Sequence, residues 1–149
     1  MDKLDVIASS RLFEMLSNSE MVHLAELAEQ RRYGAGDIVF EEGELGDSLY
    51  VIVEGEVEVV RRDSGGVPRP LTVLTAPEFF GEMSLIDKEY RSATVRARTE
   101  AVLLRLSAEQ LSVFRQSYRD GFTFVVINIA RVLSARIREA NARLTARQS

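Results

Sequence analysis

Residues 79–97, with the sequence FFGEMSLIDKEYRSATVRA, combine more ligand-binding groups than any other part of the chain. Gly81 precedes a short predicted helix, and the first N–H groups of a helix have no partner within it, so an anion can bind there. Arg91 can bind a phosphate group through two parallel hydrogen bonds. Ionised Glu82 only accepts hydrogen bonds, so it suits a sugar hydroxyl and repels phosphate. The stretch therefore predicts a nucleotide site with sugar at one end and phosphate at the other.

The rest of the composition argues against catalysis. The chain has no cysteine and a single histidine, His23, which excludes thiolate and multi-histidine metal sites as well as a cysteine nucleophile. No second carboxylate, nucleophile or base stands at a defined spacing from Glu82. His23 has charged neighbours on a predicted helix, so we expect it to face solvent and assign it no role. We therefore predict that the protein is not an enzyme and has no catalytic residue, no metal and no cofactor.

Length and charge bound the class of protein. The 149 residues are enough for one domain with a substantial core. No apolar run approaches the ~18 residues of a membrane span, and the N-terminus lacks the apolar core of a signal peptide. We therefore expect a cytoplasmic protein that binds no membrane. Because the net charge is −4, we also expect that the protein does not bind nucleic acid directly. The C-terminal arginines are interpreted as the solvated face of a helix, with an anion-binding face as the alternative: Arg131, Arg136, Arg138, Arg143 and Arg147.

Residues 1–106 contain the elements expected to position this site. Residues 1–30 are predicted to be helical because apolar residues recur every three or four positions, with an interruption at 17–20 where Ser19 is a candidate N-cap. Residues 31–106 contain about seven or eight short β-rich runs separated by glycines, and residues 63–70 are expected to form an exposed hairpin loop. Such a series of strands predicts a closed antiparallel barrel or a jelly roll.

Residues 107–147 are predicted to be helical again. Ser107 is expected to cap a short helix over 108–116, and a break at 118–121 precedes a long helix that reaches about residue 146. One apolar face of the long helix is wide enough to bury two surfaces, the barrel and the same helix of a second copy. We therefore predict a homodimer through residues 122–144, with a helix that folds back wholly onto the barrel as the alternative. The face consists of Phe122, Val126, Ile129, Leu133, Ile137, Ala140 and Leu144, widened by Val125 and Val132.

The predicted fold class is therefore α+β, mainly β: a single domain over residues 1–149, with an antiparallel jelly-roll β-barrel flanked by N-terminal helices and a long C-terminal helix. Jelly-roll barrels also house metal enzymes. Their sites use clustered histidines and carboxylates aimed into the barrel, which this chain does not offer.

Five motifs in order, between about Leu12 and Ile137, give this chain a resemblance to the cyclic nucleotide-binding domain family. That family includes the catabolite activator protein, cyclic-nucleotide-dependent kinases and cyclic-nucleotide-gated channels. The motifs are Gly36-Asp37 before an Ile-Val-Phe run, Glu42-Gly43, Gly46-Asp47-Ser48-Leu49-Tyr50-Val51-Ile52, Gly55-Glu56-Val57, and Phe80-Gly81-Glu82-Met83-Ser84-Leu85 with Arg91-Ser92-Ala93-Thr94 nine residues after Glu82.

The resemblance implies a role for each matched residue of residues 79–97. Glu82 is expected to accept the ribose 2′-hydroxyl, and Arg91 to bind the cyclic phosphate. The phosphate would also receive hydrogen bonds from backbone N–H groups around Gly81, Met83 and Ser84 and from the Ser92 hydroxyl. The alternative for Glu82 and Arg91 is an internal salt bridge in a domain that has lost its ligand.

The same resemblance implies a regulatory mechanism, because in the family the helix after the barrel moves over the purine as a lid. Of the polar residues on the long helix, Arg131, Ser134, Arg136 and Asn141, an ungapped comparison with the catabolite activator pattern favours Arg136 as the residue over the base. The expected ligand is cAMP in preference to cGMP. The alternative is an interaction scaffold that works through the C-terminal helix and is ligand-independent or responds to a cyclic dinucleotide.

The chain departs from the family pattern in three places. Ala76-Pro77 stand where the family often has a glycine, and the hairpin around Gly65 and Gly66 is particular to this chain. The sequence reaches Ser149 without the winged helix-turn-helix of the catabolite activator relatives and without a kinase, channel or cyclase segment. We therefore expect either a stand-alone sensor that acts on a downstream protein partner or a domain of a longer protein, and the start MDKLDVIASS favours the first.

Overall fold

The computed structural model describes residues 2–87 and 90–148; residues 1, 88, 89 and 149 of the predicted domain lie outside this range. The N-terminal elements are α1 (Lys3–Ser9), the 3-10 helix η1 (Arg11–Phe13) and α2 (Asn18–Leu27). The strands are β1 (Glu29–Tyr33), β2 (Ile38–Phe40), β3 (Ser48–Glu54), β4 (Glu56–Arg62), β5 (Pro68–Thr75), β6 (Phe79–Phe80), β7 (Thr94–Ala97) and β8 (Ala101–Ser107). The remaining helices are α3 (Met83–Asp87), α4 (Ala108–Ser117) and α5 (Arg119–Gln148).

The strands form two antiparallel four-stranded sheets, in the orders β1-β8-β3-β6 and β2-β7-β4-β5. Strands that are neighbours in sequence, such as β3 and β4, belong to different sheets, which is the arrangement of a jelly roll. The predicted α+β jelly roll is confirmed. The sheets are not joined into one closed barrel, since no strand pairing connects them in the described part of the chain.

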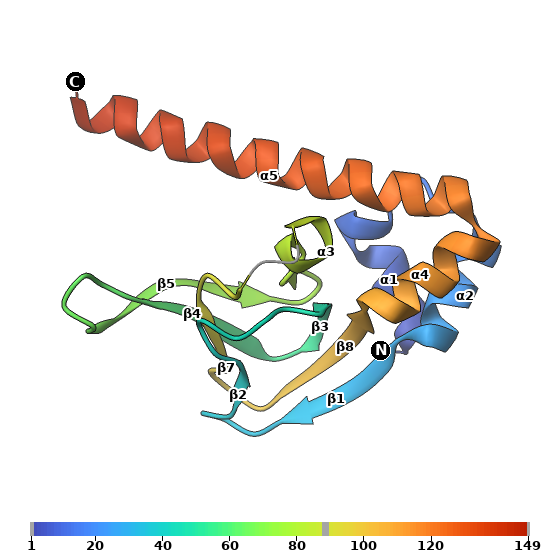
Figure 1. Cartoon of the computed structure of the whole chain (residues 1–149), viewed down its shortest axis with the longest axis horizontal. Coiled ribbons are helices and arrows are strands. Elements are labelled where there is room, and N and C mark those ends of the chain that lie inside the picture. Colours follow the sequence, from blue (N-terminus) through green and yellow to red (C-terminus); the bar gives the residue numbers. More distant parts are fainter. Residues whose placement is uncertain (1, 88–89, 149) are drawn as a thin grey trace.

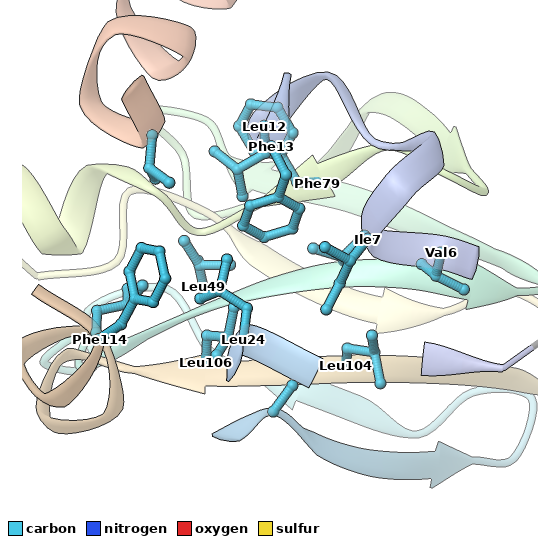
Figure 2. Close-up of a cluster of buried hydrophobic side chains, with 14 of the residues drawn as sticks. Val6, Ile7, Leu12, Phe13, Leu24, Leu49, Phe79, Leu104, Leu106 and Phe114 are labelled. Atoms are coloured by element: carbon cyan, nitrogen blue, oxygen red, sulfur yellow. The ribbon is translucent and has the colours of Figure 1, made fainter. Parts of the chain in front are cut away.

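The sheet β1-β8-β3-β6 separates two layers of core, which explains why β3 is a continuous apolar run and not an alternating one. On one face, Leu49, Val51 and Leu104 pack against α1, α2, α4 and the first turns of α5 (Figure 2). On the other face, Tyr50, Ile52 and Leu103 pack against the second sheet. Helices α1, α2 and α4 thus lie together at one end of the molecule, and the second sheet projects away from them (Figure 1).

The helix boundaries confirm one predicted cap and correct another. Ser107 caps α4, and its side chain and that of Gln110 form a reciprocal capping box. The cap of α2 is Ser17 and not Ser19, because the side chain of Glu20 reaches back to the backbone N–H of Ser17. The first strand starts at Glu29, two positions before the expected boundary at residue 31.

The prediction that His23 faces solvent is wrong. The imidazole ring is partly buried between α2 and α4, with its centroid 5.8 Å from that of Phe114 and 5.4 Å from that of Tyr118. Its Nδ1 atom is buried without a hydrogen-bond partner in the described part of the chain. The charged neighbours in sequence misled the prediction because consecutive residues of a helix point in different directions.

Helix α5 runs along the length of the molecule, from the N-terminal helices at one end past α3 near its middle, and its C-terminal end extends well beyond α3 (Figure 1). Its buried side consists of Gly121, Val125, Asn128 and Ile129. The predicted apolar face is therefore divided: Ile129 is buried, whereas Ile137 is 60% and Leu144 54% exposed. In the part of the chain that the structure describes, no helix is both long and apolar enough to cross a membrane.

Asn128 attaches the first half of α5 to the N-terminal region. Its side-chain amide donates hydrogen bonds to the backbone carbonyls of Leu12 at 3.0 Å and Glu14 at 2.9 Å. The residue is only 2% exposed, so both bonds are made away from bulk water. Asn128 therefore fixes the point from which the rest of α5 extends.

We expect Asn128→Ala to lower the free energy of unfolding by about 2–4 kcal/mol, because it leaves two carbonyl groups without their donor. Asn141→Ala is the matched control on the exposed side of the same helix and should change stability by less than about 0.5 kcal/mol. Urea titration measures both. Equal midpoints for the two variants would show that Asn128 does not hold α5 in place.

Candidate functional site

A cavity of about 650 Å³ lies between the β2-β7-β4-β5 sheet, α3 and α5. All seven residues predicted to bind the ligand contribute to its walls: Gly81, Glu82, Met83, Ser84, Arg91, Ser92 and Arg136. Other parts of the wall come from Val59, Thr72 and Leu74 of strands β4 and β5 and from Leu133, Glu139 and Arg143 of α5. Residues of a hairpin and of a helix, from Leu74 to Leu133 more than fifty positions apart in sequence, thus form one site.

Arg91 is the most buried cation of the site, at 8% exposure. Its Nη2 donates to the backbone carbonyl of Ser48 at 2.8 Å, and its Nη1 to the carbonyl of Gly81 at 3.1 Å and to Ser84 Oγ at 3.4 Å. No ion pair joins it to a carboxylate within the residues described. Burial lowers the pKa of the guanidinium, although the nearby Tyr50, Asp47 and Glu44 act in the opposite direction.

Two glycines make room for this guanidinium. A Cβ atom at Gly46 would lie 2.6 Å from Ser84 Cβ and 3.0 Å from Arg91 Cζ. At Gly81 the backbone has a positive φ of 80°, and a Cβ atom would lie 2.9 Å from Arg91 Nη1. Both positions therefore require the absence of a side chain for Arg91 to occupy its present place.

Glu82 lies directly before α3, within residues 79–97, which we call the cassette, and is 4% exposed. Its Oε1 is 3.3 Å from Arg136 Nη1, and this ion pair connects the cassette to α5. Glu82 and Arg91, both described, do not pair with each other, so the internal salt bridge considered as the alternative is absent. Arg136 is about half exposed and lies over the ring of Phe79, with Cζ 5.9 Å from the centroid.

Ser84 and Ser92 differ in their surroundings. Ser84 is 6% exposed, and its hydroxyl lies 2.9 Å from the carbonyl oxygen of Gly81 and 3.3 Å from that of Ser48, so it shares the acceptors of Arg91. Ser92 is exposed at the cavity, and its backbone carbonyl accepts a hydrogen bond from Arg61 Nε at 3.0 Å. The Ser92 hydroxyl is therefore better placed than that of Ser84 to meet a ligand.

Sequence reasoning missed Phe40, Glu139 and Arg143, which also line the cavity. The other polar candidates of the long helix, Arg131, Ser134 and Asn141, are not among its lining residues. The spacing offered a signal for two of the missed residues, because positions three and seven after Arg136 lie on the same side of a helix. The described residues contain no group of histidines, cysteines and carboxylates that could hold a metal ion.

Comparison with known proteins identifies the class. The family model for the cyclic nucleotide-binding domain matches residues 30–118, more than half of the chain. The cyclic AMP receptor protein of Thermus thermophilus is 36% identical over 91% of this chain and 61% of its own length. The cAMP-dependent protein kinase regulatory subunit of Aspergillus fumigatus is 33% identical over 74% of this chain and 24% of its own length.

A solved structure of a cyclic nucleotide-binding domain from Methylobacillus flagellatus superposes with a TM-score of 0.84 at 27% identity. That match covers 97% of this chain and 82% of the other. The chain therefore belongs to the cyclic nucleotide-binding domain family, with the jelly-roll fold of its relatives. It spans less than two thirds of the length of the Thermus relative.

Proposed function

We propose that this chain is a regulatory module that senses a cyclic nucleotide, with cAMP preferred to cGMP. The observation that carries the proposal is the buried guanidinium of Arg91, which has carbonyl and hydroxyl partners but no described carboxylate partner. An unpaired buried charge is unfavourable by several kcal/mol, so an anion that enters the cavity regains much of this energy. The cyclic phosphate of a nucleotide is such an anion.

Glu82 and Arg136 suit the sugar and base ends of the same ligand. Buried Glu82 can accept a hydrogen bond from the ribose 2′-hydroxyl with the oxygen that Arg136 leaves unoccupied. Arg136 would stay paired with Glu82 and present its guanidinium plane to the purine. The Ser92 hydroxyl would add a hydrogen bond to the phosphate.

The relatives support a regulatory role without catalysis. One is named a cyclic AMP receptor protein and another a regulatory subunit of a cAMP-dependent kinase. Both names include cAMP, which favours this ligand for the present chain as well. We therefore assign the chain no catalytic step, place it in the cytoplasm, and expect it to act on a downstream protein partner and not directly on nucleic acid.

We expect ligand binding to be transmitted through α5. Leu133, Arg136, Glu139 and Arg143 face the cavity from this helix, so a ligand contacts both the cassette and α5. A ligand shifts a conformational equilibrium only by its difference in affinity between the two states. A purine that contacts these side chains favours the position of α5 that covers it.

The wild-type protein is expected to bind cAMP more tightly than 2′-deoxy-cAMP by about 10- to 100-fold, because the deoxy analogue lacks the hydrogen bond to a charged Glu82. Glu82→Ala, which has no acceptor at this position, should bind the two ligands with nearly equal affinity. Arg91→Gln should weaken both by roughly 100-fold or more, since the phosphate then loses a charge-assisted pair. Calorimetric titration measures each Kd, with cGMP as the competing purine.

Thermal unfolding is an independent check on binding. A ligand at 100 times its Kd should stabilise the wild type by about 2.7 kcal/mol, and a variant that has lost binding should show no such stabilisation. Chromatography of cAMP after incubation with the protein distinguishes a sensor from an enzyme, because a sensor leaves the ligand unchanged. If no cyclic mononucleotide or dinucleotide stabilises the wild type, the sensing function is wrong and a ligand-independent scaffold is favoured.

The position of α5 can be followed with spin labels, since the chain has no cysteine of its own. With labels at Gln30→Cys on β1 and Asn141→Cys on α5, saturating cAMP should change the measured distance distribution. With labels at Gln30→Cys and Thr123→Cys the distribution should stay constant, because Asn128 holds the first half of α5. Identical distributions for the first pair, in a sample shown to be saturated, would rule out transmission through α5.

We also propose that the chain forms a homodimer through residues 122–144. The divided apolar face supports this: Val126, Ile137 and Leu144 remain 43–60% exposed after α5 has packed on its own domain. Three large apolar side chains along one side of an exposed helix are suited to the same surface of a second copy.

In sedimentation, we expect Ile137→Asp to be a monomer at concentrations where the wild type is a dimer, because the substitution places a charge in the apolar contact. Ser134→Asp adds the same charge at an exposed position of α5 and should remain a dimer. A monomeric wild type, with or without cAMP, would exclude this interface.

A further inference from the structure

Phe40 lies at the end of β2, is 9% exposed, and contributes to the cavity wall. Its ring is part of an aromatic group with Tyr50, at 6.0 Å between centroids, and Phe80, at 5.9 Å. Tyr50 and Phe80 are themselves stacked at 5.2 Å. The ring of Phe40 is therefore supported from within the core, and its orientation is restricted.

The guanidinium of Arg91 lies over this ring, with Cζ 3.9 Å from the centroid. The backbone of Gly46 is also close to the guanidinium, since a Cβ atom there would be 3.0 Å from both Cζ and Nε. The Nη atoms donate to the carbonyls of Ser48 and Gly81. Aromatic, backbone and carbonyl contacts together define where the guanidinium lies before any anion is present.

The ring attracts the cation without neutralising it, and this distinguishes Phe40 from a carboxylate. A desolvated cation–π contact is favourable, yet the full positive charge remains available to an anion. Asp47 and Glu44 are near enough to act electrostatically on the guanidinium, but neither forms an ion pair with it. Without the ring, the guanidinium would be free to turn toward one of these carboxylates, and it would then no longer be available to bind a phosphate.

We propose that Phe40 is a positioning residue for anion recognition, which acts on the ligand through Arg91 by keeping the guanidinium in place and unpaired. This inference rests on the proposed binding of a cyclic nucleotide. Phe40 would contribute to affinity by preorganisation, because the free protein need not surrender a competing ion pair when the phosphate binds.

A double-mutant cycle tests this role, with cAMP affinity as the readout. Phe40→Leu should raise the Kd by about tenfold when Arg91 is present. In an Arg91→Gln background the same substitution should change the Kd by less than about twofold. An equal loss in both backgrounds would show that Phe40 contacts the ligand or merely supports the fold, and would overturn the proposal.

Two aromatic replacements keep the test valid if Phe40→Leu folds poorly. Phe40→Tyr retains the ring and should bind cAMP within about threefold of the wild type. Replacement of Phe40 by 3,4,5-trifluorophenylalanine keeps the shape of the ring but removes the electron density that attracts a cation. The Kd for cAMP should therefore rise when Arg91 is present and stay unchanged in the Arg91→Gln background. An unchanged Kd for the fluorinated protein would also overturn the proposal.

A ligand-free measurement separates this inference from the proposed function. In the wild type, the Arg91 Nε–H proton resonance should be displaced by the ring current of Phe40, and Phe40→Leu should remove the displacement. If the wild type binds no cyclic nucleotide but shows the displaced resonance, the proposed sensing function is wrong and the stacking of Arg91 on Phe40 is supported. The double-mutant cycle is then repeated with inorganic phosphate as the anion. If the resonance is not displaced, the positioning role is wrong whatever the ligand.

Discussion

The site depends on one unfavourable interaction, the burial of the Arg91 charge without a described carboxylate to pair with it. Desolvation of a guanidinium is tolerated only where its N–H groups find acceptors. The acceptors here are the carbonyl of Ser48, at the start of β3, and the carbonyl of Gly81, two residues before α3. The register of a core strand and the turn after β6 therefore determine where the cation lies. The large apolar core under β3 provides the stability that permits such a site.

The charges around the cavity explain why a monoanion fits it. Among the described residues that line it, three are arginines and two are glutamates, which leaves one positive charge: Arg91, Arg136, Arg143, Glu82 and Glu139. Because Glu82 already pairs with Arg136, the excess lies toward Arg91. A cyclic phosphodiester carries a single negative charge, so its binding makes the site neutral. A terminal phosphate with two charges would leave an excess negative charge in a partly buried cavity.

The sequence was sufficient to predict the jelly-roll fold and to single out residues 79–97 as the candidate site, because both predictions depend on local signals. Glycines that require a positive φ, alternating apolar residues and the pair of Glu82 and Arg91 are all readable along the chain. Contacts between distant segments were not readable. The partner of Glu82 is Arg136, 54 positions away, and His23 is partly buried against α4 because of how the helices pack. The N-cap of α2 was predicted wrongly for a different reason. Ser17 and Ser19 are equally suitable residue types, and only the hydrogen bonds between Ser17 and Glu20 decide between them.

The divided face of α5 is compatible with the proposed transmission, because only its first half belongs to the core. Up to about Ile129 the helix is held by buried apolar contacts and by Asn128, so movement there would disrupt the core. From Leu133 onward its inward side chains line the cavity, and its ion pair with Glu82 is a single, partly exposed contact. No side chain from residue 130 to residue 146 is buried, so few apolar contacts oppose displacement of this half. The ion pair does oppose it, because its loss leaves the buried Glu82 carboxylate without Arg136. On the proposed mechanism, the boundary between a fixed and a displaceable part of α5 would lie between Ile129 and Leu133, directly before the residues that line the cavity.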